Sequence, residues 1–275
     1  MLTNPRAERV RRVARLSGRS AREKHGQYLV EGPQAVREAL RHVPQQVRDV
    51  YHTADAAARH PELLADARGA VRYVHETSEA VMGAMSTDAQ GLLAVLDRPT
   101  AEPGLADLPA LRDGQGPRLV AVLAQVTDPG NAGTVIRAAD AAGADAVVLC
   151  AGSVEVRSPK VVRATAGSLF HLPVITGVGL AETVAALRGT GASVLAADGA
   201  GGWDLDDLLD RTVLALDLAG PTSWVFGHEA RGLSEEETAM CDAVVRVPIH
   251  GRAESLNLAV AAAVCLYASA RAQRR

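Results

Sequence analysis

The stretch LVAVLAQVTDPGNAGTVIRAADAAGADAVVLC, residues 119–150, contains two apolar runs separated by a loop and a helical pattern. The first run, residues 119–126, is almost continuously apolar, as is typical of strands in a parallel sheet covered on both faces. A Pro-Gly turn follows it, and Asn131 is a natural N-cap for the next helix. Residues 144–150 form the second apolar run. This strand–helix–strand order predicts an α/β fold with a parallel sheet.

The same alternation continues on both sides of this stretch. Toward the C-terminus, further strands are expected at LPVIT, ASVLAAD, TVLALD, SWVFG and AVVRVPI, residues 172–176, 192–198, 212–217, 223–227 and 243–249. A long helix is expected from Ser255 to about Gln273. Toward the N-terminus, strands are expected at QYLVEG, VRDVYHT, RYVHE and GLLAVLD, with helices at residues 33–42, 54–67 and 78–85 between them.

The length of the chain and a proline- and glycine-rich segment within it predict two domains. A chain of 275 residues exceeds one average domain. Residues 98–117 are rich in proline and glycine and show no sustained period, so they are expected to be a linker. They separate a smaller α/β domain, residues 25–97, from a larger one, residues 118–275. Residues 1–24 are set apart as a basic N-terminal arm.

The charge of the chain is distributed unevenly. The net charge is −3, yet residues 1–24 carry eight basic and two acidic side chains, a balance of +6. Such an asymmetry indicates a basic arm with an anionic partner, although a solvated tail is the alternative interpretation. The spacing of Val10, Val13 and Leu16 predicts a helix in this arm. The arginines expected to contact this anionic partner are Arg9, Arg11, Arg12, Arg15, Arg19 and Arg22.

The sequence lacks the signatures of several classes of protein. Cys150, Cys241 and Cys265 are widely spaced and odd in number, so no disulfide framework is expected, and a reducing cytoplasm fits. The N-terminus has no apolar stretch of a signal peptide, and the longest apolar run, Leu258 to Ala268, is too short to cross a bilayer. No H-E-x-x-H motif or paired C-x-x-C occurs, so no metal is expected at the reaction site. The glycine fingerprint of nicotinamide-dependent oxidoreductases is also missing.

Three unusual segments follow apolar strands, at the end where open α/β sheets bind ligands. They are residues 126–137, VTDPGNAGTVIR; residues 226–237, FGHEARGLSEEE; and residues 247–258, VPIHGRAESLNL. In the first, Gly133, Thr134 and Arg137 share one helical face. In the second, Ser234 and Glu237 form a capping-box pattern. In the third, Ser255 is expected to cap the long C-terminal helix. Each segment alone is compatible with an ordinary strand–loop–helix joint.

Together, the three segments resemble the signature motifs of the SpoU (TrmH-like) RNA 2′-O-methyltransferases of the SPOUT class. The first motif, roughly N-x-G-x-x-x-R, is matched by Asn131, Gly133 and Arg137. The second, G-x-E-x-x-G-[LM], is matched by Gly227, Glu229, Gly232 and Leu233. The third, P-x-x-G-x-x-x-S-L-N, is matched by Pro248, Gly251, Ser255, Leu256 and Asn257. Residues 158–174 and the smaller N-terminal domain also look like the family. Ala138 departs from the Thr or Ser that more usually follows the motif arginine.

The resemblance implies an enzyme that transfers a methyl group from S-adenosylmethionine to a ribose 2′-hydroxyl of structured RNA, with ribosomal (23S) RNA as the expected target. It implies a deep trefoil knot in the C-terminal domain, an RNA substrate-binding N-terminal domain, and a homodimer with the active site at the subunit interface. Carried over by position, the reaction site would comprise Asn131, Arg137, Glu229, Ser255 and Asn257. The methyl donor would contact Ala196, Gly227, Val247, Pro248 and Leu256.

Two alternatives to this interpretation stay open. The first is the same reaction on transfer RNA. The second is a non-catalytic RNA-binding or ribosome-assembly module on the same fold, against which the intact Arg137, Glu229 and Asn257 argue. With aromatic residues at only 3%, RNA is expected to be recognised through phosphates and shape more than through base stacking.

Overall fold

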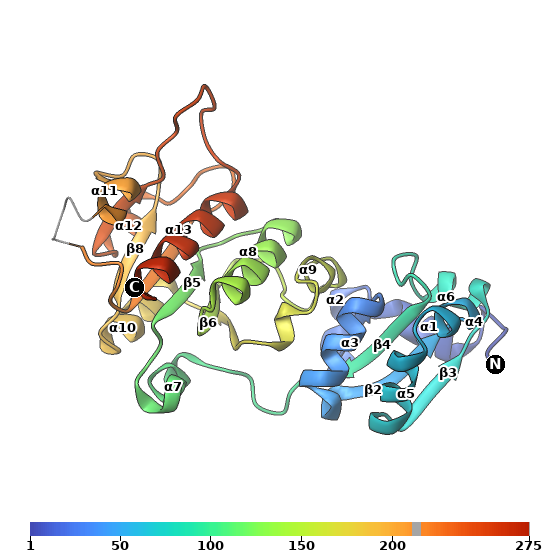
Figure 1. The fold of residues 1–275 in the computed structure, drawn as a ribbon. Coiled ribbons are helices and arrows are strands. Elements are labelled where there is room, and N and C mark those ends of the chain that lie inside the picture. The colour runs from blue at the N-terminus through green and yellow to red at the C-terminus, as the bar shows by residue number, and fades with distance from the viewer. Residues whose placement is uncertain (211–215, 275) are drawn as a thin grey trace. The chain divides into compact units, whose positions relative to one another are not determined.

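The computed structural model describes residues 1–210 and 216–274 and divides into two compact units (Figure 1). The first unit comprises Met1–Ala101 and Glu155–His171. The second comprises Glu102–Val154 and Leu172–Arg275. The boundary near residue 101 falls inside the expected linker. The assignment of residues 155–171 to the first unit was not expected from the sequence, which placed them in the larger domain.

The first unit is built on a mixed four-stranded sheet in the order β1-β4-β2-β3. Its strands are β1 (Gln27–Glu31), β2 (Val47–His52), β3 (Tyr73–Glu76) and β4 (Leu92–Asp97). Strand β4 runs antiparallel to β1 and β2, whereas β2 and β3 are parallel. Its helices are α3 (Pro33–His42), α4 (Ala54–Arg59), α5 (Pro61–Ala70) and α6 (Glu79–Met85). The single helix expected over residues 54–67 is therefore divided, because Pro61 cannot continue a helix and begins a new one at its first position.

Both faces of this sheet are covered by apolar side chains. Alternate residues of β4 point to opposite faces, so that Leu92 packs with α3 and α5 while Leu93 packs with α6. The second of these clusters also contains Val10, Val13 and Leu16. They come from α1 (Glu8–Arg15), the helix that the sequence predicts in residues 1–24, and from the residue that follows it.

Residues 1–24 are therefore not the separate arm that the charge pattern indicated. Helix α1 and the following helix α2 (Arg19–His25) belong to the first unit. Arg22 is only 3% exposed, and its guanidinium donates to Glu155 from Nε at 2.9 Å and from Nη2 at 2.5 Å. Because Arg22 is buried in this ion pair, it is not available to contact RNA, contrary to the expectation from the sequence. The remaining five arginines of that list are exposed.

Residues 155–171 lie between β6 and β7 in the sequence but pack within the first unit. They contain α9 (Pro159–Ala164) and the 3-10 turn η3 (Ser168–Phe170). Val162 is fully buried in the α3–α5 cluster. The guanidinium of Arg163 pairs with Glu31 and, at 3.0 Å, with Asp88. Buried apolar contacts and ion pairs together therefore hold this segment, termed here the β6–β7 insert, to the first unit.

The second unit is built on a seven-stranded sheet in the order β7-β6-β5-β10-β8-β11-β9, in which every described pair is parallel. Its strands are β5 (Leu119–Leu123), β6 (Ala146–Cys150), β7 (Val174–Val178), β8 (Ser193–Ala197), β9 (Trp203–Asp204), β10 (Thr222–Phe226) and β11 (Ala243–Arg246). The expected α/β fold with a mostly parallel sheet is confirmed. The strand expected at 212–217 falls largely on residues 211–215, outside the described residues.

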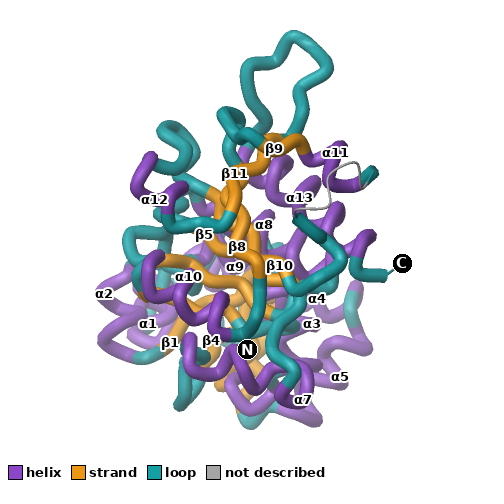
Figure 2. The backbone as a smooth tube through the Cα atoms, turned by 90° about the vertical axis from the view of Figure 1, so that its left-hand side faces the viewer, coloured by secondary structure: helices purple, strands orange, loops and turns teal. Residues whose placement is uncertain are grey.

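Helices cover both faces of the parallel sheet. They are η2 (Leu105–Ala110), α7 (Leu111–Gly114), α8 (Pro129–Ala142), α10 (Leu180–Gly189), α11 (Leu205–Leu209), α12 (Glu235–Ala239) and α13 (Leu258–Ala272). Helices α8 and α13 pack side by side (Figure 1). In Figure 2, α10 and α12 lie on the other side of the strands from α13. A buried hydrogen bond of 2.9 Å from Trp224 Nε1 to Ser269 Oγ joins β10 to α13.

This topology places a ligand site near β5 and β10. From β5 the chain builds outward through β6 and β7, and then crosses to the opposite half of the sheet. Neighbouring strands whose connections leave in opposite directions form a switch point, where a crevice opens at their carboxyl ends. The first two of the three signature segments follow β5 and β10, and the third follows β11.

Candidate active site

The loop after β5 begins helix α8 in a way that differs from the expected one. Asp128, and not Asn131, is the N-cap: its Oδ1 accepts a hydrogen bond of 2.7 Å from the Asn131 backbone N–H. Pro129 occupies the first helical position, where its missing N–H costs nothing. The Asn131 side chain is consequently not used for capping and is available for contacts across the site.

Glu229, from the loop after β10, accepts hydrogen bonds from the loop after β5. Its carboxylate accepts from the backbone N–H of Asp128 at 2.9 Å and of Thr127 at 3.3 Å, and from the Asn131 side-chain amide at 3.5 Å. Partial burial opposes ionisation of this carboxyl, but the hydrogen bonds from Asp128, Thr127 and Asn131 outweigh it and hold the pKa of Glu229 below its ordinary value. Glu229 is therefore a fixed anion at neutral pH.

Asn257 connects the third segment to the first. Its Nδ2 donates to Asn131 Oδ1 at 3.0 Å, and its Oδ1 accepts from the Ala259 N–H at 2.9 Å. The second bond makes Asn257 the N-cap of α13, so the expected cap at Ser255 is wrong by two residues. The side chains of Glu229, Asn131 and Asn257 thus form one hydrogen-bonded row through all three segments.

A cleft of about 330 Å³ opens beside this row. Its wall includes Gly227, which no other residue can replace without displacing backbone, because an added Cβ would lie 2.4 Å from the carbonyl carbon of Gly232. The close approach arises because His228 and Gly232 pair through two backbone hydrogen bonds and fold the loop back on itself. The lining residues are Ala197, Asp198, Gly199, Phe226, Gly227, His228, Glu229, Ala230, Gly232, Val245, Val247, Ile249, Glu254, Ser255, Leu256, Leu258 and Ala261.

The structure separates the expected donor contacts into two groups. Gly227, Val247 and Leu256 line the cleft, whereas Pro248 lines a different hollow beside α11 and α13. Ala196 is completely buried in the core, because successive residues of a strand face opposite ways, and its neighbour Ala197 lines the cleft in its place. Ala196 and Pro248 therefore do not line this cleft, unlike the other three expected donor contacts.

Sequence reasoning missed Asp198, which lines the cleft immediately after β8. Its Oδ1 accepts from the Ala200 N–H at 2.9 Å and orders the loop. The available signal was its position: Asp198 is the first polar residue at the carboxyl end of a buried strand.

Two further residues were expected at the reaction site, Ser255 and Arg137. Neither is part of the hydrogen-bonded row. Ser255 lines the cleft. Arg137 is exposed on α8 and makes no hydrogen bond or ion pair within the described residues. It lies six residues after Asn131, about 9 Å along the helix. The described residues thus leave the Arg137 guanidinium free to bind a ligand.

Comparison with known proteins identifies the family. Residues 118–267, more than half of the chain, match the SpoU rRNA methylase family. The chain belongs to this family. Residues 7–94 match the MRM3-like substrate-binding domain, which includes α1 and α2 of the first unit and so agrees with their packing there.

Relatives of this SpoU enzyme cover nearly its whole length. The 23S rRNA (guanosine-2′-O-)-methyltransferase RlmB of Bordetella pertussis is 32% identical over 88% of this chain and 96% of the relative. The 23S rRNA (uridine(2479)-2′-O)-methyltransferase of Streptomyces viridochromogenes is 30% identical over 94% and 87%. The crystal structure of the SpoU methyltransferase AviRb from Streptomyces viridochromogenes with AdoMet has a TM-score of 0.80 and 29% identity, covering 98% of both chains.

These findings confirm the family resemblance, the SPOUT fold class and the enzyme class. The SpoU chain is an S-adenosylmethionine-dependent RNA 2′-O-methyltransferase. No helix within residues 1–210 and 216–274 is long and apolar enough to cross a membrane. Cys150, Cys241 and Cys265 form no disulfide with one another in the structure.

Proposed function

We propose that this SpoU-family enzyme methylates a ribose 2′-hydroxyl of 23S ribosomal RNA. The hydrogen-bonded row of Glu229, Asn131 and Asn257 beside the cleft carries the catalytic part of the proposal. The choice of 23S RNA is supported by relatives that are named for it and that match both the substrate-binding and the methyltransferase parts of the chain. The names of these relatives therefore favour ribosomal RNA over transfer RNA as the substrate.

The cleft fits a methyl donor of the size of S-adenosylmethionine. Its volume of about 330 Å³ lies at the lower end of the range for small-molecule sites. Its wall combines backbone exposed at Gly227 with apolar surface from Val247 and Leu256. We assign to these three residues, together with Ala197 and Asp198, the binding of the donor. When bound, S-adenosylmethionine supplies an electrophilic methyl group.

The protein's own task is to hold the ribose hydroxyl in line with that methyl group. The side chains of Asn131 and Asn257 are fixed by their mutual bond and by the carboxylate of Glu229, so they are suited to orient a hydroxyl. Ser255, on the cleft wall, is a further candidate for this contact. We assign to Arg137 the binding of a neighbouring phosphate, because an arginine guanidinium stays protonated in proteins and is therefore a poor proton acceptor.

The enzyme is proposed to act as a homodimer. Val260, Val264 and Tyr267 lie at three- and four-residue spacing on α13 and are 40–50% exposed. An exposed apolar stripe of this kind is typical of an interface. A second copy of the chain is the proposed occupant. Because Asn257 of the reaction site caps α13, a dimer formed on this helix would border that site.

The family resemblance also implies the RNA-binding surface, the chain topology and the cellular location that we propose here. RNA is proposed to contact the first unit through the exposed Arg9, Arg11, Arg12, Arg15 and Arg19. We also retain the deep trefoil knot of the methyltransferase domain and the cytoplasmic location, which suits an enzyme with an RNA substrate and unpaired cysteines.

The test is transfer of labelled methyl from S-adenosylmethionine to unmodified 23S RNA, 16S RNA and transfer RNA, followed by nucleoside analysis. A 2′-O-methylated nucleoside in 23S RNA alone is the expected result. The Asn131→Ala variant should abolish transfer, whereas Glu235→Gln, an exposed change on α12, should not. Label in transfer RNA alone would contradict the substrate proposal. Donor binding without transfer to any naked RNA or to assembled subunits would favour the non-catalytic module.

A further inference from the structure

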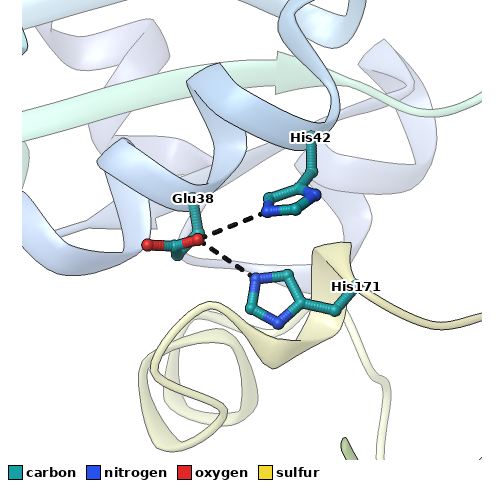
Figure 3. Close-up of side chains that lie close together, drawn as sticks. All are labelled: Glu38, His42 and His171. Atoms are coloured by element: carbon teal, nitrogen blue, oxygen red, sulfur yellow. Dashed lines mark hydrogen bonds and ion pairs between the residues drawn. The ribbon is translucent and has the colours of Figure 1, made fainter.

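Two histidines and a glutamate of the first unit converge on one point (Figure 3). Glu38 and His42 are one turn apart on α3, and His171 closes the β6–β7 insert. One carboxylate oxygen, Glu38 Oε2, is 3.2 Å from His171 Nε2 and 3.5 Å from His42 Nε2. The two imidazoles are tilted by 54° with centroids 4.5 Å apart, so they are not stacked face to face. All three ligand atoms lie within 4.8 Å of one another.

These separations match the edges of a metal coordination sphere. Zinc binds imidazole nitrogen and carboxylate oxygen at about 2.0–2.1 Å in tetrahedral geometry, which puts neighbouring ligand atoms roughly 3.3 Å apart. The two separations from Glu38 Oε2 lie close to that edge. The third separation, between the two imidazole nitrogens, is no more than 4.8 Å, so a shift of at most about 1.5 Å of the exposed His42 ring brings it to that edge. Three protein ligands and one open position for water complete a four-coordinate site.

The carboxylate is already oriented for this role. Glu38 is buried, and its other oxygen, Oε1, accepts from Gln34 Nε2 at 3.3 Å and lies 3.7 Å from the Arg41 guanidinium. These contacts leave Oε2 facing the two histidines. Outer partners that fix a ligand in this way are a regular feature of metal sites.

Close packing brings the insert onto α3 at this point. Gly167 has φ +106° and approaches Glu38 so closely that an added Cβ would lie 2.5 Å from the Glu38 Cγ. The stem of the carboxylate is therefore covered by backbone of the insert, while the histidine side remains open to solvent.

We propose that Glu38, His42 and His171 bind a divalent transition metal of the zinc class and that this metal clips the β6–β7 insert to α3. Two imidazoles with one carboxylate suit such a cation, whereas Ca²⁺ and Mg²⁺ prefer oxygen ligands throughout. The site lies outside the hydrogen-bonded row of the reaction site and uses none of its residues. Its role is to secure the insert, to which buried Val162 and the ion pair of Arg163 also contribute.

The proposal is tested on the full chain after chelator treatment, by calorimetric titration with Zn²⁺ and by the visible absorption of bound Co²⁺. One equivalent per chain and a tetrahedral Co²⁺ spectrum are expected. His42→Ala, His171→Ala and Glu38→Gln should each weaken binding by more than the roughly 10–100-fold that loss of an outer partner costs. Gln34→Ala should weaken it about 10-fold. His25→Ala, at a histidine elsewhere in the first unit, is the matched control.

Thermal unfolding monitored with and without Zn²⁺ tests whether the metal binds the folded state in preference to the unfolded chain, as a clip requires. A metal that binds only the folded state raises the unfolding temperature, and it should do so in the parent and in His25→Ala but not in His171→Ala. Equal unfolding temperatures of all variants without metal would show that the substitutions leave the fold intact. Absence of Zn²⁺ binding, or binding that survives His42→Ala and His171→Ala alike, would overturn the proposal. Binding without any thermal shift would overturn the clip.

Discussion

Glu229 is the residue that ties two of the three loops of the cleft together. It accepts backbone hydrogen bonds from Thr127 and Asp128 and contacts Asn131, which in turn bonds to Asn257. A carboxylate at this position both neutralises exposed N–H groups near the start of α8 and sets the orientation of the two asparagines. Its charge is therefore expected to affect stability as well as methyl transfer.

Glu229→Gln preserves the size of the side chain and removes its charge. We expect kcat/KM to fall by at least about 100-fold, comparable to the removal of one preorganised electrostatic interaction. We also expect the free energy of unfolding to fall by about 1 kcal/mol at neutral pH, a low value for charged hydrogen bonds because the side chain is partly exposed. Methyl-transfer assays and denaturant unfolding give the two quantities. Full activity in the variant would contradict the assigned role.

The stability difference should depend on pH in one direction. The pKa of Glu229 in the folded protein lies below the ordinary value of 4.5. Its ionised form therefore stabilises the fold fully above that value, and the contribution is lost as the pH falls through the folded-state pKa. Unfolding curves of the parent and of Glu229→Gln should accordingly converge in acid. A difference that grew on acidification would have the wrong sign.

Arg137 provides a second test at the level of one side chain. If it binds phosphate, Arg137→Lys keeps the charge but removes the two-pronged geometry of the guanidinium. We expect kcat/KM to fall by about 10–100-fold at every pH, since one good bidentate pair is worth about 1–3 kcal/mol. Donor binding, followed by calorimetry, should be unchanged. A variant that regained activity with a new and lower apparent pKa would instead support a role as proton acceptor.

At the scale of secondary structure, α1 has two functional faces. Val10 and Val13 point into the core of the first unit, whereas Arg11, Arg12 and Arg15 are exposed. The apolar spacing, read from the sequence, predicts the helix. It did not reveal that a core was available to receive it, because the other residues that form this core lie mostly between positions 29 and 95.

The two faces of α1 predict two different phenotypes. Replacing Arg11, Arg12 and Arg15 together by Ala should leave the unfolding temperature nearly unchanged. The same change should reduce the slope of RNA affinity against salt concentration by about 0.7–0.9 for each phosphate that the arginines neutralise in the parent protein. Val13→Ala should cost about 2 kcal/mol, since it deletes two buried methyl groups and leaves a cavity. Filter-binding titrations at several salt concentrations and denaturant unfolding distinguish the two. An unchanged salt slope in the triple variant would remove α1 from the RNA-binding surface.

At the scale of the whole molecule, the proposed dimer depends on the exposed face of α13. Tyr267→Glu places a charge in this face, and the expected result is a monomer in sedimentation with reduced methyl transfer, because an uncompensated charge in an apolar interface is costly. Tyr73→Glu changes a tyrosine of similar exposure in the first unit and should leave assembly unchanged. A Tyr267→Glu dimer, or a monomeric parent protein, would contradict the proposal.

The sequence alone determined the class of the fold and the positions of the three signature segments. Buried parallel strands lose their alternation and are visible as apolar runs, and loops at their carboxyl ends retain unusual residues such as Gly227 and Glu229. These patterns are local, so they can be read along the chain. The same locality explains why the helix over residues 33–42 was predicted with its observed bounds.

Only the tertiary structure decided which residues meet. The caps of α8 and α13 are Asp128 and Asn257, whereas the Asn131 side chain bonds to Asn257 across the site. Local preference alone leaves open which of several neighbouring polar residues is the cap. Arg22 is buried because Glu155, 133 residues away, receives it. Glu38, His42 and His171 converge for the same reason. Contacts of this kind depend on the path of the chain in space, and no period or spacing in the sequence encodes that path.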